Sequence, residues 1–322
     1  MSVLVYTESE NGKFKKNAHE VASYAYEVAK QLGTTATAIS INADSAGDLG
    51  DYGISKVLNV SNDQLNTFNA KAYAQVIGQA AEKESAKVIV LSSSADTKFL
   101  APILTAQLKA GYVPNVVSAP ESTSPFKVKR TVFSNKGFAI TEISSDVKII
   151  GVSNNAYGIA ENKTTAAVEN FDPSLGDNTF TTKSIEIDKV VGKATIADAD
   201  IVVSGGRGLK GPENWGMIEE LAEVLGAATA CSKPVSDLGW RPHGEHVGQT
   251  GKPVASNLYI AIGISGAIQH LAGVSSSKVK VVINTDPEAP FFKAADYGVV
   301  GDAFEVVPKL IEKLKEFKAQ NA

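Results

Sequence analysis

The stretch 203–211, which reads VSGGRGLKG, decides how the rest of the chain is interpreted. It follows the apolar run Ile201–Val203 and precedes Asn214–Leu225, where apolar residues recur at helical spacing. Its three glycines match the pattern G-x-G-x-x-G: Gly206, Gly208 and Gly211. A strand, such a turn and a helix in succession are typical of dinucleotide-binding α/β sheets. The stretch therefore predicts an α/β fold and leaves open which ligand its loop meets.

Strand-like and helix-like runs alternate along both halves of the chain. The strand patterns of the first half are Val3–Thr7, Thr37–Ile41, Lys56–Val60 and Val88–Leu91, and its helical patterns are Asn17–Leu32, Ala72–Glu82 and Phe99–Ala110. A hairpin signal at Asn135–Gly137 lies between Lys127–Phe133 and Phe138–Ile143. The second half has strands Ile201–Ser204, Tyr259–Ile262 and Val279–Asn284, and helices Asn214–Leu225, Gly266–Ala272 and one beginning at Pro308. This alternation predicts two mostly parallel sheets, each flanked by helices.

A polar region separates the two halves. The chain has 322 residues, enough for two domains at roughly 150 residues each. From about residue 155 to residue 198 the sequence is polar and has little helical periodicity. We place a linker near residues 186–197. We therefore expect an N-terminal domain over residues 1–187 and a C-terminal domain over residues 188–322.

The composition excludes several classes of protein. The formal net charge of -4, with scattered Lys and Arg, leaves no basic footprint for nucleic acid. The single cysteine, Cys231, excludes a disulfide within the chain, and the four histidines lack metal-ligand spacing. The sequence opens directly on a strand and contains no apolar run long enough to span a bilayer. We expect a cytoplasmic protein that is not embedded in a membrane and holds no metal.

The glycine pattern fails part of the test for a nicotinamide dinucleotide. Such a site needs an acidic residue about twenty positions further on to hold the ribose. Residues 227–233 contain no carboxylate, and Asp237 comes after Pro234, where the strand has ended. Arg207 is a fixed cation among the glycines and can lie beside a phosphate or a ring. An NAD-dependent dehydrogenase therefore stays the alternative from the enzyme class.

Two further loops offer groups for an anion or a ring. Residues 247–252, VGQTGK, miss the phosphate-binding loop of nucleotide hydrolases, which would need glycine at His246 and Ser or Thr at Pro253. In residues 262–270 we read Ser265 as a helix N-cap and Gly266–His270 as a first turn, whose free N–H groups favour an anion. His270 adds a donor there, although a buried helical histidine without a ligand is the alternative.

Four segments in this order resemble the alpha subunit of electron-transfer flavoproteins. They are SGGRGLKGPEN (204–214), VGQTGK (247–252), YIAIGISGAIQHLAG (259–273) and INTDPEAPFFKAADYGVVGD (283–302). The resemblance implies one half of a heterodimer with a beta subunit that holds one FAD. It also implies an N-terminal domain at the partner interface and a doubly wound C-terminal domain with most FAD contacts. Such a chain carries electrons and has no substrate chemistry of its own.

The resemblance also implies where each part of the FAD lies. Arg207, Ser232 and Lys233 would lie near the ring or the pyrophosphate, and Val247, Gly248, Gln249 and Thr250 would wrap the isoalloxazine, with Thr250 toward N5. The pyrophosphate would meet Ser265, Gly266, Ala267, Ile268, Gln269 and His270, with His270 near O2 of the ring. Asn284, Asp302 and Ala303 would hold the adenosine end.

One residue departs from the pattern of the family, in which an Arg often follows the serine that is Ser232 here. This chain has Lys233, which keeps the charge but loses the planar fork. The resemblance further implies flavin dehydrogenases of the acyl-CoA type, as in fatty acid beta-oxidation, as electron donors, and a quinone oxidoreductase as acceptor. An electron-bifurcating relative with a second flavin in the partner subunit stays open.

Overall fold

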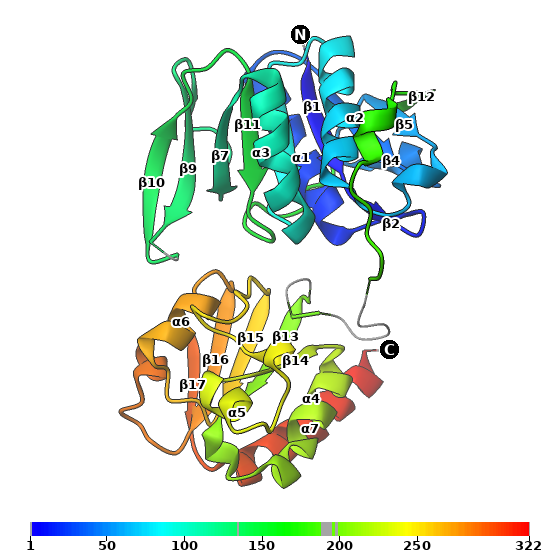
Figure 1. Ribbon diagram of the computed structural model, residues 1–322. Coiled ribbons are helices and arrows are strands. Elements are labelled where there is room, and N and C mark those ends of the chain that lie inside the picture. Colours follow the sequence, from blue (N-terminus) through cyan, green and yellow to red (C-terminus); the bar gives the residue numbers. More distant parts are fainter. Residues whose placement is uncertain (1, 134, 188–194, 197–198, 322) are drawn as a thin grey trace. The chain divides into compact units, whose positions relative to one another are not determined.

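The computed structural model describes residues 2–133, 135–187, 195–196 and 199–321. These fall into two compact units, each with its own sheet (Figure 1). The first unit comprises Met1–Val132 and Phe138–Asp188, and the second comprises Phe133–Gly137 and Lys189–Ala322. Most of the linker expected at residues 186–197 lies outside the described residues. In the described part of the chain no helix is long and apolar enough to cross a membrane.

The first unit contains a ten-stranded sheet in the order β10-β9-β7-β11-β6-β1-β4-β5-β12, with β8 beside β9. Its strands are β1 (Val3–Thr7), β4 (Ala36–Ile41), β5 (Lys56–Val60), β6 (Val88–Ser92), β7 (Gly111–Val116), β8 (Ser122–Thr123), β9 (Phe126–Val132), β10 (Gly137–Glu142), β11 (Lys148–Val152) and β12 (Ala167–Asn170). The strands from β7 through β12 in this order pair in parallel, whereas β9 pairs antiparallel to β7 and β8. The two short strands β2 (Ser9–Glu10) and β3 (Lys13–Phe14) form a separate hairpin.

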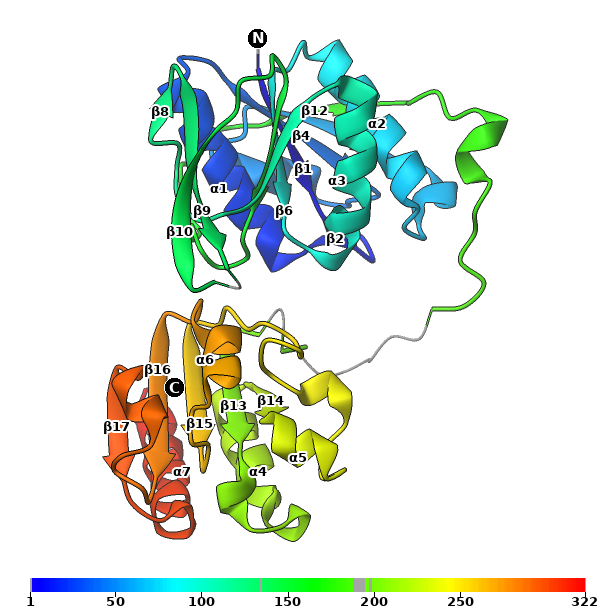
Figure 2. The same cartoon turned by 60° about the vertical axis from the view of Figure 1, so that its left-hand side comes forward.

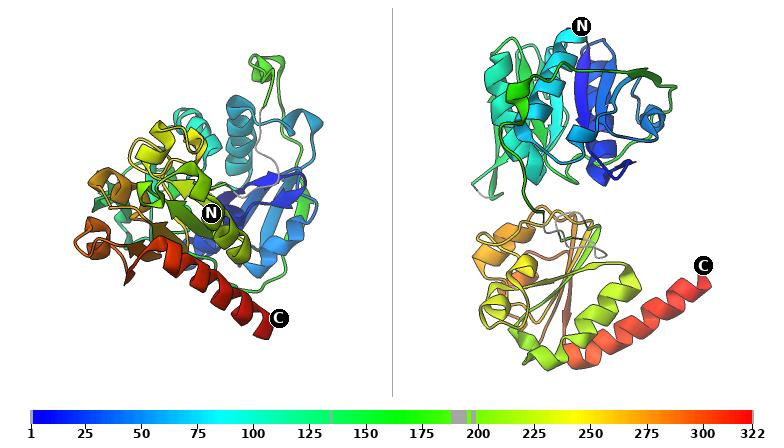
Figure 3. Two further views of the ribbon diagram at one scale, coloured as in Figure 1. Left: turned by 90° about the horizontal axis from the view of Figure 1, so that it is seen from below. Right: turned by 45° about the vertical axis from the view of Figure 1, so that its right-hand side comes forward.

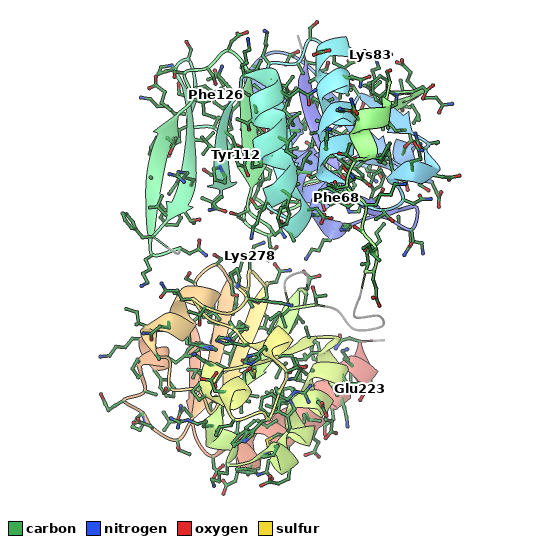
Figure 4. All side chains as sticks on the ribbon, in the orientation of Figure 1. Phe68, Lys83, Tyr112, Phe126, Glu223 and Lys278 are labelled. Atoms are coloured by element: carbon green, nitrogen blue, oxygen red, sulfur yellow. The ribbon has the colours of Figure 1, made fainter. Side chains whose placement is uncertain are left out.

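Helices cover both faces of this first sheet, as parallel strands require (Figure 2). Helix α1 (Lys16–Gln31) packs on one face, and α2 (Ala70–Lys83) and α3 (Ala95–Leu108) pack on the other. Consecutive strand residues such as Leu4 and Val5 enter opposite cores because side chains alternate along a strand. Phe126 belongs to the α1 core and Phe68 packs against the other (Figure 4).

The second unit has a five-stranded sheet, entirely parallel, in the order β14-β13-β15-β16-β17. Its strands are β13 (Ile201–Gly205), β14 (Ala228–Cys231), β15 (Leu258–Ile262), β16 (Val279–Asn284) and β17 (Tyr297–Val300). Helices α4 (Gly216–Leu225) and α7 (Ala303–Gln320) lie side by side on one face (Figure 3). Helix α6 (Ile268–Val274) packs with the other core, and α5 (Lys233–Asp237) is a short helix after β14. The α/β fold class predicted from the sequence is confirmed.

The order of strands in the second sheet fixes where a ligand is expected. After β13 the chain adds β14 on one side and then crosses to add β15 on the other side. The connection after β13 therefore leads to one side of the sheet and the connection after β15 to the other, and both start at the carboxyl ends of these neighbouring strands. Open α/β sheets bind ligands at such a topological switch point.

Three predicted helix starts in this unit are wrong. Helix α4 begins at Gly216, two residues later than expected. Helix α6 begins at Ile268, two residues later than expected, because Gly266 has a left-handed φ of +86° that a helix cannot include. Helix α7 begins at Ala303 and contains Pro308 in its interior, whereas the sequence pattern predicts Pro308 at the first position. The Asp302 side chain accepts a hydrogen bond from the N–H of Phe304 at 3.0 Å, so this carboxylate sets the true start.

Candidate functional site

The loops after β13 and β15 are locked together through glycine backbone. The Gly206 N–H donates to the Ile262 carbonyl at 2.8 Å, and the Gly208 N–H donates to the Gly263 carbonyl at 3.1 Å. A Cβ atom on Gly206 would lie 2.1 Å from the Gly263 carbonyl oxygen, and one on Gly208 would lie 2.7 Å from the Gly263 Cα. Only glycine permits this approach. The glycine pattern at 206–211 therefore joins two loops at the switch point.

Beyond this junction the chain presents a row of free backbone donors. Among the described residues the N–H groups from Ser265 through Gln269 have no hydrogen-bond acceptor. The turn is held by the Phe291 N–H, which donates to the Ser265 carbonyl at 3.0 Å. Its shape requires Gly266, where a Cβ would lie 2.5 Å from the Phe291 nitrogen. Successive free N–H groups make an anion-binding concavity.

The expected N-cap role of Ser265 is wrong. Ala267 occupies the N-cap position of α6, and no side chain caps that helix. Ser265 is exposed and precedes the left-handed Gly266, so its hydroxyl does not cap helix α6.

The 246–252 loop is fastened to the same edge of the sheet. The Val247 N–H donates to the Cys231 carbonyl at 3.0 Å, and the Gln249 N–H donates to the Gln269 carbonyl at 2.8 Å. Val247 is buried in the core beside α6, whereas Gln249 and Thr250 are exposed. The loop thus anchors itself through Val247 and leaves the Gln249 amide and the Thr250 hydroxyl accessible from outside.

His270 is buried at this edge with one ring nitrogen satisfied and the other free. Its Nε2 lies 3.0 Å from the Tyr259 hydroxyl, and its side chain is only 6% exposed. Its Nδ1 has no hydrogen-bond partner among the described residues. Burial lowers the pKa of His270 to about 4, and the nearby His246 acts in the same direction. The Val247 backbone has the opposite, smaller effect on this pKa. His270 is therefore a neutral imidazole at pH 7.

The candidate cations lie at the surface. Arg207 is exposed in the turn Arg207–Leu209 that follows Gly206. Lys233 Nζ lies 3.6 Å from a carboxylate oxygen of Asp237, one turn along α5. Both side chains of this pair are more than half exposed, so the pairing is weak in water and leaves Lys233 able to reorient. Ser232, which precedes Lys233, is buried, and the Ser232 N–H donates to the Gly205 carbonyl at 3.1 Å.

The residues expected at the adenosine end already have partners within the chain. The Asn284 amide donates to the Ile264 carbonyl at 3.0 Å, which ties β16 to the loop after β15. Asp302 caps α7, and its other oxygen lies 3.8 Å from Lys210 Nζ. Ala303 is buried, so only its backbone could meet a ligand. The contacts proposed for these three residues stay predictions.

Three residues that sequence reasoning missed complete the site: Tyr259, Gly263 and Phe291. Tyr259 holds His270, Gly263 receives the glycine loop, and Phe291 fixes the turn at Ser265. All three look like ordinary core or loop residues in the sequence. Gly263 carried the best signal, since it directly follows a predicted strand.

The arrangement suits a ligand with a diphosphate and a hydrogen-bonding ring. A diphosphate matches the free N–H groups of Ser265–Gln269. A ring carbonyl or nitrogen could satisfy the orphaned Nδ1 of His270, which otherwise stays buried at a cost. Both parts occur in FAD, and residues 227–233, which include the end of β14, contain no carboxylate for a nicotinamide ribose. The residues present therefore fit FAD.

Comparisons with known proteins identify the family. Residues 195–275 match the family model described as electron transfer flavoprotein FAD-binding domain, and residues 3–175 match electron transfer flavoprotein domain. Electron transfer flavoprotein subunit alpha of Bacillus subtilis (strain 168) is 37% identical, with 98% of this chain and 97% of that protein covered. The subunit alpha of Thermoanaerobacterium thermosaccharolyticum is 35% identical (98% and 98% covered), and Protein FixB of Clostridium saccharobutylicum is 33% identical (98% and 96%). The chain belongs to the electron transfer flavoproteins as an alpha subunit, an electron carrier with FAD as its cofactor.

Proposed function

We propose that the chain is the FAD-holding half of a heterodimer with an electron transfer flavoprotein beta subunit. It carries single electrons from flavin dehydrogenases of the acyl-CoA type to a quinone oxidoreductase of the respiratory chain. The observation that supports this most directly is the row of free N–H groups from Ser265 to Gln269 beside the orphaned Nδ1 of His270. Such fixed donors would hold a diphosphate, and the imidazole would offer a hydrogen bond to a ring edge.

The residues of this chain bind and orient, while the flavin supplies the one-electron chemistry. Amide donors that are already fixed need no reorganisation when charge appears on the ligand. The neutral N–H of an imidazole can stabilise negative charge on a ring edge without adding a buried cation. The exposed Lys233 and Arg207 add positive charge from the solvent side. This arrangement favours a carrier that gains electrons one at a time.

We propose that the first unit serves as the interface with the beta subunit. Its own sheet and two apolar cores make it a self-contained support. A fragment of residues 1–185 should bind the partner and no FAD. Stoichiometric flavin on that fragment would contradict this division of roles.

Co-expression with the presumed beta subunit tests the proposal. We expect a yellow heterodimer whose absorbance spectrum shows one FAD per pair of chains. A colourless protein that retains NAD would support the dehydrogenase alternative and refute the proposal.

An electron-bifurcating variant is the second candidate, because one of the similar proteins is the differently named Protein FixB. Its extra flavin would lie in the partner subunit. Flavin stoichiometry separates the two candidates, since two flavins per heterodimer would favour bifurcation and one would favour the simple carrier.

A further inference from the structure

Tyr259 and His270 form a buried pair whose geometry is fixed on every side. The phenol of Tyr259 is fully buried, and its hydroxyl lies 3.0 Å from Nε2 of His270. The Tyr259 ring stacks on Phe291, with centroids 6.3 Å apart and planes 4° from parallel. The His270 ring lies 6.0 Å from the same phenylalanine ring. Strand β15, helix α6 and the segment at Phe291 therefore hold one hydrogen bond in place.

The proton in this bond has one well-formed position. A phenol and a neutral imidazole can each donate or accept, so the partners around them decide. Burial raises the pKa of Tyr259 far above its usual value, and the phenol therefore keeps its proton and needs an acceptor. The Ser204 hydroxyl on β13 is near enough to affect that pKa, but it makes no aligned hydrogen bond among the described residues. The acceptor is consequently Nε2 of His270.

This direction determines the tautomer of His270. When Nε2 accepts from the phenol, the single proton of the neutral imidazole must be on Nδ1. The Val247 backbone interacts with the His270 ring and raises its pKa, an effect that burial outweighs. Nδ1 itself is buried and has no aligned partner among the described residues. The pair thus leaves a buried N–H donor that makes no aligned hydrogen bond with the described residues.

We propose that Tyr259 is a positioning residue that holds His270 as a neutral donor through Nδ1, reserved for the bound FAD. The part about FAD rests on the function proposed above. Tyr259 touches no ligand in this scheme and acts only through His270. The hydroxyl is the essential group, because the ring alone would suffice for stacking on Phe291.

The variant Tyr259→Phe removes the hydroxyl and keeps the ring. Without the phenol, Nε2 can carry the proton itself, and the donor at Nδ1 is lost in those molecules. Tyr297→Phe is the matched control, because Tyr297 lies on the edge strand β17 of the same sheet and is 67% exposed. Both substitutions remove one phenol oxygen from the same unit.

The test uses the FAD-loaded heterodimer labelled with ¹⁵N-histidine and long-range ¹H–¹⁵N correlation, which separates protonated from bare ring nitrogens. We expect Nδ1 of His270 to be protonated and Nε2 bare in the wild type and in Tyr297→Phe. In Tyr259→Phe the Nε2 resonance should move toward the protonated value. The affinity for FAD should fall about tenfold, the factor that loss of one hydrogen bond gives.

His270→Asn provides a second measurement. Its amide N–H₂ lies near the place of Nδ1 and cannot change tautomer. Adding Tyr259→Phe to His270→Asn should therefore leave FAD affinity unchanged, whereas a role in stacking or packing would lower affinity equally in both backgrounds.

The outcomes separate this inference from the proposed function. A protonated Nε2 in the wild type, or an unchanged tautomer in Tyr259→Phe, overturns the role of Tyr259 even if FAD is bound. A wild-type protein that binds no FAD refutes the proposed function, while the tautomer can still be measured on the same labelled histidine.

Discussion

Replacing Gly206 by alanine should break the junction on which the site is built. The added Cβ would lie 2.1 Å from the Gly263 carbonyl oxygen and 2.7 Å from the Gly263 carbonyl carbon. Carbon and oxygen that are not bonded approach to about 3.3 Å, so the two loops would have to separate by about 1 Å. Both colliding atoms belong to the backbone, so no side-chain rotation can relieve the contact.

The cost follows from the hydrogen bonds that this separation breaks. The bonds from Gly206 to Ile262 and from Gly208 to Gly263 measure 2.8 and 3.1 Å. A buried backbone group left without a partner costs about 1–3 kcal/mol. With partial relaxation we expect Gly206→Ala to lower the free energy of unfolding of the second unit by about 3–5 kcal/mol.

Tryptophan fluorescence during urea unfolding of the purified chain measures this effect. The two tryptophans of the chain, Trp215 and Trp240, both lie in the second unit, so the signal reports that unit alone. For a urea dependence of about 2 kcal/mol per M, the unfolding midpoint should fall by roughly 1.5–2.5 M. FAD content after reconstitution with the partner should fall in parallel.

Gly216→Ala is the matched control. Gly216 is the first residue of α4, and its added Cβ meets no atom within 4 Å. This variant should keep the midpoint or raise it, by up to about 1 kcal/mol of stability. If Gly206→Ala unfolds at the wild-type midpoint and retains FAD, the close approach of the two loops is not what supports the site.

Three further predictions concern single side chains. Glu20 is 4% exposed and accepts hydrogen bonds from the backbone N–H groups of Asn155 (2.6 Å), Tyr157 (2.9 Å) and Gly158 (2.8 Å). Glu20→Ala leaves these donors without an acceptor and should therefore lower the free energy of unfolding of the first unit by about 3–5 kcal/mol. Thermal unfolding measures the effect, and Glu20→Gln should lie between Glu20→Ala and the wild type. Burial lowers the pKa of His270 from 6.5 to about 4, so between these pH values the folded state binds fewer protons than the unfolded state. The stabilisation is complete above pH 6.5, and the free energy of unfolding should fall by up to about 3 kcal/mol as the pH drops toward 4. Urea titrations at several pH values measure this slope, which His270→Asn should flatten. Lys233→Ala should lower the one-electron potential of the bound flavin in spectroelectrochemical titration, and an unchanged potential would count against a role for that charge.

Much of the first unit could be predicted because its buried strands are short segments rich in Val, Leu and Ile. Val3–Thr7 and Lys56–Val60 have the predicted bounds. Strand β7 was missed because Gly111 and Pro114 look like the end of a helix. Pro114 lies where the register between β7 and β11 shifts by one residue. Proline has no N–H to donate, and at this irregularity no regular hydrogen bond between the two strands is lost.

The site was harder to predict because its chemistry depends on pairs of residues. His270 was recognisable as a donor, but its partner Tyr259 belongs to a strand whose alternation only predicts burial. The tautomer of the histidine follows from that partner and from the poor alignment of Ser204 on a third element. Spacing along the chain carries no information on how three buried side chains meet.

The glycine pattern shows why a motif can be right about place and wrong about ligand. Glycine is required wherever backbone approaches another group closely, and the sequence does not say whether that group is a pyrophosphate or a second loop. Here Gly206 and Gly208 approach Gly263, and this contact brings the loop after β15 to the switch point. The longest unbroken row of free donors in the two loops belongs to that second loop, from Ser265 through Gln269. A dinucleotide fingerprint should therefore be tested by asking which backbone each glycine faces, because the ligand meets the loop whose N–H groups are left unpaired.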